Sequence, residues 1–144
     1  MISLPDEAYG GLAVGWATVE LERAAGELSH LLVPGSAFMD APSSAILGAR
    51  CRVGAAGERA GLRIVLLEPE TEGRLAATLA RRGEGWAATW EMSHVVSEPQ
   101  GLLPGPPRPT VPKRRPGPLG SERLIAAAGS AVPHRLLVDV PSQP

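Results

Sequence analysis

Short runs of apolar residues, separated by turn-forming residues, recur along the first two-thirds of the chain. Their length and their content of Val, Leu and small residues are typical of strands. The second run ends at a turn over Asp40-Ala41-Pro42, and the last is entered through Gly83-Glu84-Gly85. We therefore predict five strands, which span residues 11–19, 36–39, 46–53, 62–68 and 85–92.

Two segments between these runs have the apolar spacing of amphipathic helices. Residues 20–32 place leucines and alanines on one side of a helix, and Pro34-Gly35 ends the pattern. Residues 71–82 place Leu75 and Leu79 one turn apart, and two arginines follow, where cations suit the negative end of a helix dipole. The predicted order up to residue 92 is strand, helix, three strands, helix, strand.

The last third of the chain is dominated by proline. Residues 98–120 hold eight of the fifteen prolines. Proline has no backbone donor and a fixed torsion, which excludes a long helix or a central strand here and leaves edge or loop structure. Two closing strands are predicted after this segment, over residues 122–128 and 135–140.

Composition narrows the class of protein. A length of 144 residues suits one domain. The net charge of −1 gives no bulk attraction to nucleic acid or to anionic membranes, and no apolar run reaches the length of a bilayer span. The single Cys51 offers no internal disulfide and no thiol cluster for a metal. We expect a cytoplasmic protein with neither nucleic acid nor membrane as a partner.

Three short motifs carry a resemblance to a known family. VGWATVELERA at 14–24, LLEP at 66–69 and RRGEG at 81–85 stand in an order and spacing that resemble glyoxalase-like domains of the vicinal oxygen chelate superfamily, most closely the methylmalonyl-CoA epimerase type. The resemblance implies an α+β fold in which paired βαβββ modules form a curved mixed sheet around a cavity. It also implies a homodimer, because the family often pairs modules between chains.

The resemblance divides the chain as a single glyoxalase-like domain. Residues 11–69 match a first module, residues 71–82 a linking helix, and residues 85–140 a second module. This second module is degenerate, since the Pro-rich segment 98–120 stands where its helix is expected.

The family's metal ligands are usually two His and one or two Glu or Gln on inward-facing strand positions. The resemblance puts those positions at Ala13, Val65, Ala87 and Ala88, and near Leu137. Alkyl side chains offer no donor to a divalent cation. We therefore expect no metal and no other cofactor.

Strand alternation extends the inward-facing set, because every second residue shares a face. The result is an apolar hollow with a Trp wall and charged groups at the rim, which is the usual make-up of a small-molecule pocket. An arginine there can pair with a carboxylate or phosphate. Two alternatives stay open: the arginines are surface residues at strand ends, and the tryptophan is core. The candidate ligand-binding residues are Ala13, Gly15, Arg63, Val65, Ala88, Trp90, Arg135 and Leu137.

The sequence does not identify catalytic residues. Glu91 and His94, three residues apart near a strand end, are candidates for an acid–base pair, and Asp139 is a further candidate at the rim. Three functions follow as hypotheses. The first is metal-free binding of a small organic, acidic or aromatic ligand. The second is a metal-independent isomerase, cyclase or lyase of specialised metabolism in the same cavity. The third is a structural or regulatory partner domain that docks through its Pro-rich segment.

Overall fold

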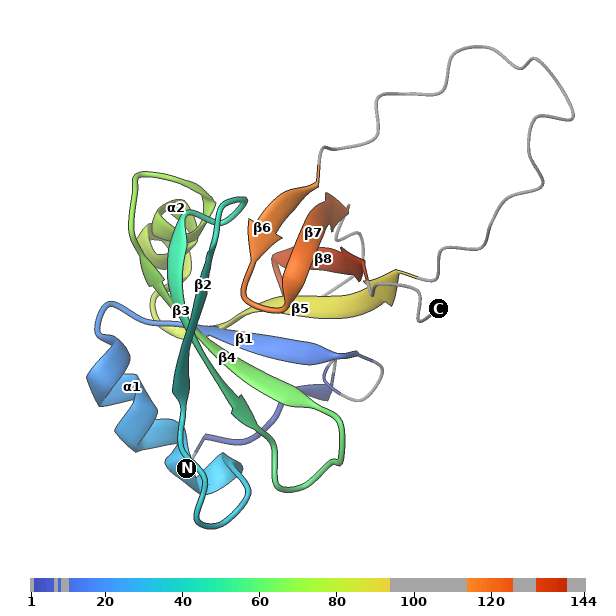
Figure 1. Ribbon diagram of the computed structural model, residues 1–144. Helices are drawn as coiled ribbons and strands as arrows, with labels where there is room; N and C mark the ends of the chain where they lie inside the picture. The colour runs from blue at the N-terminus through green and yellow to red at the C-terminus, as the bar shows by residue number, and fades with distance from the viewer. Residues whose placement is uncertain (1, 7, 9–10, 94–113, 126–131, 140–144) are drawn as a thin grey trace, which may run out of the picture.

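The computed structural model describes residues 2–6, 8, 11–93, 114–125 and 132–139 (Figure 1). Its first half contains four strands and one helix, with a short 3-10 turn after the helix. The elements are β1 (Ala13–Ala17), α1 (Leu21–Leu28), the 3-10 turn (Ser29–Leu31), β2 (Met39–Ser44), β3 (Ala49–Ala55) and β4 (Arg63–Pro69).

The second half repeats this arrangement of strands. A second helix lies between the halves and precedes a long strand, and three shorter strands close the sheet. The elements are α2 (Arg74–Arg82), β5 (Gly85–Ser93), β6 (Arg115–Gly117), β7 (Gly120–Ile125) and β8 (His134–Asp139).

All the described strands belong to one eight-stranded sheet, in the order β2-β3-β4-β1-β5-β8-β7-β6. Strand β1 pairs parallel with β4, and β5 pairs parallel with β8. The two halves join where β1 and β5 run antiparallel. Each half thus contributes four strands with equivalent pairing, and the sheet curls until its two outer strands, β2 and β6, come into contact. This confirms the predicted fold class, an α+β domain built around a curved mixed sheet.

The alternation of side chains along the strands creates two apolar layers. Ala13 and Ala17 of β1 face the inside of the curved sheet, while Val14 and Trp16 face α1. Helix α1 packs on β4, and the Leu21 N–H at its first turn donates to the Glu68 carboxylate of β4 at 3.0 Å. An anion at a helix N-terminus satisfies free donors and suits the helix dipole, so this contact helps to hold α1 on the outer face.

Three sequence predictions of local structure were wrong. Residues 40–42 belong to β2 and not to a turn, because a strand at the sheet edge tolerates Pro42, which has no N–H for a second neighbour. The predicted strand at 36–39 gives way to β2, which begins only at Met39. Strand β3 begins at Ala49, since residues 45–48 form the turn that connects it to β2.

Candidate functional site

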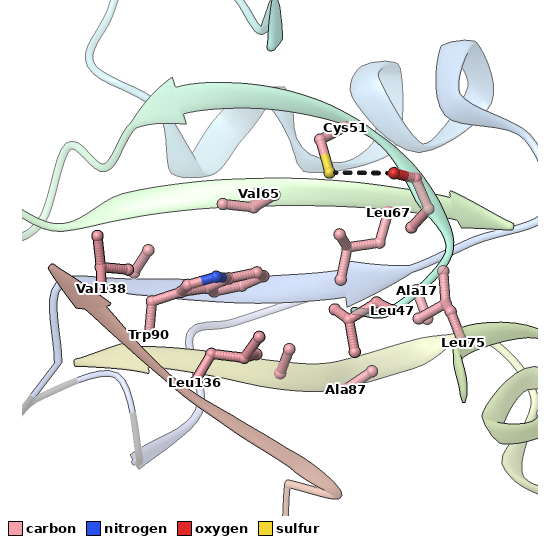
Figure 2. Packing of buried hydrophobic residues seen from close by; sticks show 13 residues of the cluster. Ala17, Leu47, Cys51, Val65, Leu67, Leu75, Ala87, Trp90, Leu136 and Val138 are labelled. Atoms are coloured by element: carbon pink, nitrogen blue, oxygen red, sulfur yellow. Dashed lines mark hydrogen bonds between the residues drawn. The ribbon is translucent and has the colours of Figure 1, made fainter. Parts of the chain in front are cut away.

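The inward face of the sheet is a closed apolar core (Figure 2). Ala13, Val65, Ala88 and Trp90, four of the candidate ligand-binding residues, are fully buried in it. The Trp90 ring lies directly over Gly15: a Cβ atom at that glycine would come within 2.7 Å of Trp90 Cζ3. The indole therefore occupies the space in which the sequence predicted a hollow.

The register of β8 differs from the predicted one by one residue. The parallel pairing of β5 with β8 sets Trp90 beside Leu136, so Leu136 and Val138 face the core. Leu137 consequently lies on the other face, half-buried. Arg135 lies on that outer face as well, where its Nη2 donates to both carboxylate oxygens of Glu91 at 2.9 Å.

The positions that resemble metal-ligand positions hold only alkyl groups in the structure. A β-bulge between β1 and β5 leaves Ala87 without a partner opposite it, and this allows both Ala87 and Ala88 to join the inner core. Neither they nor Ala13 and Val65 can donate a lone pair to a cation. Within the described residues, no group of three or more His, Cys, Asp or Glu side chains is placed to hold a metal ion. These residues do not fit a divalent metal centre.

A buried carboxyl group, which sequence reasoning missed, lies beside Trp90. Glu122 of β7 is fully buried; it accepts hydrogen bonds from Trp90 Nε1 at 2.9 Å and from Ser44 Oγ at 2.7 Å. Burial raises the pKa of Glu122, and the two hydrogen bonds lower it in part. The only sequence signal was alternation, which places Glu122 and Leu124 on one face of a predicted strand.

Two of the solvent-accessible hollows lie at one end of the curved sheet, where β1 and β4 begin. Two adjoining hollows share Leu12, Gly61 and Leu62 as their floor, and we call them together the mouth pocket. One hollow has a volume of about 390 Å³ and the other about 540 Å³. The first is completed by Ala55, Arg63 and Leu119; the second is completed by Gly11, Arg59, Ala60, Glu91 and Met92.

Arg63 is the group in the mouth pocket best suited to hold an anion. Its side chain is exposed, and no ion pair or hydrogen bond joins its guanidinium to another described residue. Glu91 in the adjoining hollow is paired with Arg135, so its charge is balanced within the protein. The structure thus brings Arg63 and Glu91 to the mouth pocket, with Arg135 paired to Glu91, and buries Ala13, Gly15, Val65, Ala88 and Trp90 in the core. His94 and the side chain of Asp139 lie outside the described residues.

Compared as a sequence, the chain matches no family model and no curated protein. Its structure is similar to a methylmalonyl-CoA epimerase from Mycobacterium tuberculosis, with a TM-score of 0.66, 20% identity, and coverage of 96% of this chain and 92% of that one. It is also similar to a variant of Streptomyces coelicolor methylmalonyl-CoA epimerase in complex with 2-nitronate-propionyl-CoA, with a TM-score of 0.62, 16% identity, and coverage of 92% and 96%.

A hypothetical protein from Bacillus halodurans C-125 matches with a TM-score of 0.58, 18% identity, and coverage of 92% of this chain and 94% of that one. At these identities the likeness establishes the fold, which is glyoxalase-like, as the sequence motifs predicted. Among the helices that the structure describes, none is long and apolar enough to cross a membrane.

Proposed function

We propose that this protein binds a small organic acid in the mouth pocket and does so without a divalent metal. The observation that carries the proposal is the Arg63 guanidinium, which borders an apolar hollow and has no carboxylate partner among the described residues. An arginine in this position can hold a carboxylate or phosphate through two parallel hydrogen bonds.

The shape and lining of the pocket support a ligand with an apolar body and an anionic end. Both hollows fall within the usual range of ligand sites, about 300–1,000 Å³. Leu12, Leu62 and Leu119 supply apolar surface, while Arg59 and Arg63 supply positive charge at the rim. Two structural neighbours were solved with CoA compounds, 2-nitronate-propionyl-CoA and methylmalonyl-CoA, which combine an acyl group with phosphates. Acyl-CoA thioesters and free aromatic acids are therefore the first ligand classes to test.

Metal-free binding is supported by donor chemistry. The alkyl groups of Ala13, Val65, Ala87 and Ala88 provide no metal ligand at these four positions, and Trp90 fills the space between the strands. The homodimer and the cytoplasmic location stay predictions. So does the docking role of the Pro-rich segment, because residues 98–113 lie outside the described part of the chain.

A second candidate function, the metal-independent isomerase or lyase, is favoured by Glu91. This carboxylate lines the same pocket as the proposed ligand and is held by Arg135. A positioned carboxylate can remove a proton next to a carbonyl group, which is the chemistry that an isomerase of this kind requires. Turnover that the wild type shows and Glu91→Gln lacks would favour the enzyme over the binding protein.

The proposal is tested by ligand screening on matched arginine variants. Saturation of the wild type at about 100 times the dissociation constant should add about 2.7 kcal/mol to stability, or roughly 5–10 °C in Tm. Arg63→Ala should weaken binding roughly 10- to 100-fold, since a charge-assisted hydrogen bond contributes about 1.5–3 kcal/mol. The ligand affinity of Arg63→Lys should fall between that of the wild type and that of Arg63→Ala.

The matched control is Arg81→Ala, which removes another exposed arginine, from α2, outside the mouth pocket. It should bind like the wild type. Equal affinity of Arg63→Ala and wild type for every acid that binds would contradict the assignment of the pocket. A tightly held, stoichiometric divalent ion in purified protein would contradict the metal-free part.

A further inference from the structure

The two outer strands of the sheet meet at a seam that backbone hydrogen bonding barely closes. Every other pair of neighbouring strands is joined by a ladder, whereas β2 and β6 share, among the described residues, one backbone bond, from Ala45 N–H just after β2 to Pro116 O at 3.0 Å. In Figure 1 the end of β2 lies next to β6. The seam is therefore the border of the sheet that requires the fewest broken hydrogen bonds to open.

A side chain reinforces the seam where the backbone does not. Glu122 projects inward from β7, and its two carboxyl oxygens accept from Ser44 Oγ of β2 and from Trp90 Nε1 of β5. It also presses on β6: a Cβ atom at Gly117 would come within 1.9 Å of Glu122 Oε1. From β7, one carboxyl group thus contacts three other strands, and it connects the first half of the chain with the second.

The hydrogen-bond partners of Glu122 are too few to stabilise its ionised form fully. Ser44 Oγ accepts from Leu47 N–H at 3.2 Å, and its second lone pair can accept the proton of a neutral Glu122 across the 2.7 Å contact. Two donors are fewer than the four acceptor positions of an ionised carboxylate. Burial raises the pKa of Glu122, because water cannot solvate the anion in this interior.

Few charged groups face the carboxyl from the elements packed against it. From β6, Arg115 is its register partner, but that side chain is exposed. From β3, Cys51 is buried, and its pKa of about 12 keeps the thiol neutral at ordinary pH. Strand β8 contributes Val138 opposite Glu122, and β5 contributes Trp90. Among these described groups, none is placed to neutralise a buried carboxylate.

We propose that Glu122 is a proton-dependent latch, which holds the β2–β6 seam closed while it carries its proton and releases the seam when it ionises. Opening lowers the free-energy cost of the buried charge, because water then reaches the carboxylate through the border with the fewest backbone hydrogen bonds. It also exposes the inner core around Trp90, which is the part of this fold that is otherwise sealed.

The direction of the pH dependence follows from the raised pKa. A carboxyl whose pKa is higher in the closed state than in the open state favours closure below both values. This preference is lost as pH rises through the pKa of the closed state. The seam should therefore open more often as pH rises through the pKa of the closed state, by up to tenfold for each unit that separates the two pKa values.

Amide hydrogen exchange on the whole chain tests the latch without any ligand, so its result is independent of the proposed binding function. The probe is the Ala45 amide, corrected for the intrinsic exchange rate, between pH 5 and pH 9. The reference is the Thr18 amide, which donates to Leu67 O at 2.8 Å away from the seam. In the wild type, protection of Ala45 should fall with pH relative to Thr18.

Glu122→Gln keeps the shape of the neutral acid and cannot ionise, so its Ala45 protection should not change with pH. Glu58→Gln, which alters an exposed carboxylate in the loop after β3, should behave like the wild type. The latch is refuted if the ratio of Ala45 to Thr18 protection in the wild type does not change with pH. It is also refuted if Glu122→Gln shows the same change of this ratio with pH as the wild type. Should Glu122→Gln fail to fold, wild-type protein labelled with 5-fluorotryptophan provides a second test. The fluorine chemical shift of Trp90 should change over the same pH range as Ala45 exchange. A Trp90 chemical shift that does not change with pH would overturn the proposal.

Discussion

Replacement of Trp90 by Phe isolates the hydrogen bond between the core and the buried acid. The variant keeps an aromatic ring over Gly15 but removes the Nε1–H donor that Glu122 accepts at 2.9 Å. A buried polar group that loses its hydrogen-bond partner costs about 1–3 kcal/mol, and the smaller ring adds a cavity term on the order of 1 kcal/mol. The expected loss is roughly 3 kcal/mol.

Trp86→Phe provides the matched control for this change. The Trp86 Nε1 donates to the Ser3 carbonyl at 2.9 Å, but this bond lies at the surface, where water can replace it. The control should therefore lose about 1 kcal/mol or less. Urea unfolding followed by circular dichroism measures both variants, and the Trp90 variant should also melt roughly 6–12 °C below the wild type.

The pH dependence sharpens the test. The Trp90 hydrogen bond lowers the pKa of Glu122, so its removal should raise that pKa further. Because a raised carboxyl pKa costs stability only as pH rises through it, the penalty of Trp90→Phe should grow from acidic to alkaline pH. Equal losses in the two Trp→Phe variants at every pH would refute the idea that Trp90 and Glu122 form one energetic unit.

Two further predictions concern the core and the metal. Gly15→Ala should cost about 1–3 kcal/mol by urea unfolding, since the new Cβ would lie 2.7 Å from Trp90 Cζ3 and 2.8 Å from Leu67 Cδ1. Gly26→Ala in α1, where a Cβ meets nothing within 4 Å, should be neutral or stabilising; a Gly15 variant as stable as this control would contradict the packing. Dialysis against EDTA should leave Tm unchanged within about 1 °C, because a bound divalent ion would stabilise the folded state by mass action. A clear drop in Tm would show that the protein holds a structural ion.

Much of the fold was predictable because its signals are local. The periodicity of residues 20–32 and the apolar run at 62–68 correctly indicated α1 and β4. Alternation along β1 separated Ala13 and Ala17, which face the inner core, from Trp16, which faces α1. The edge strand β2 was misjudged, since Asp40-Ala41-Pro42 has turn composition and only its position at the sheet edge makes it a strand.

The candidate site was predictable only in part, because it depends on how the strands pair with one another. Periodicity gives the face of a residue within its own strand, but the relative register of two strands depends on their pairing. This is why Leu136, and not Leu137, stands beside Trp90. Whether Trp90 lines a hollow or fills it was likewise undetermined, because that depends on the distance to Gly15 across the sheet.

By itself, the amino-acid sequence determined both helices, most of the strands and the alkyl character of the inner positions, whereas the paired arrangement of strands came from the family resemblance. The properties that the sequence determined follow from local propensity and from side-chain chemistry, which do not depend on distant neighbours. The tertiary structure alone decided that Glu122 and Ser44, 78 positions apart in the chain, share a buried hydrogen bond. Contacts between such distant segments exist only once the sheet has curled, because curvature and register arise from the packing of all the strands together.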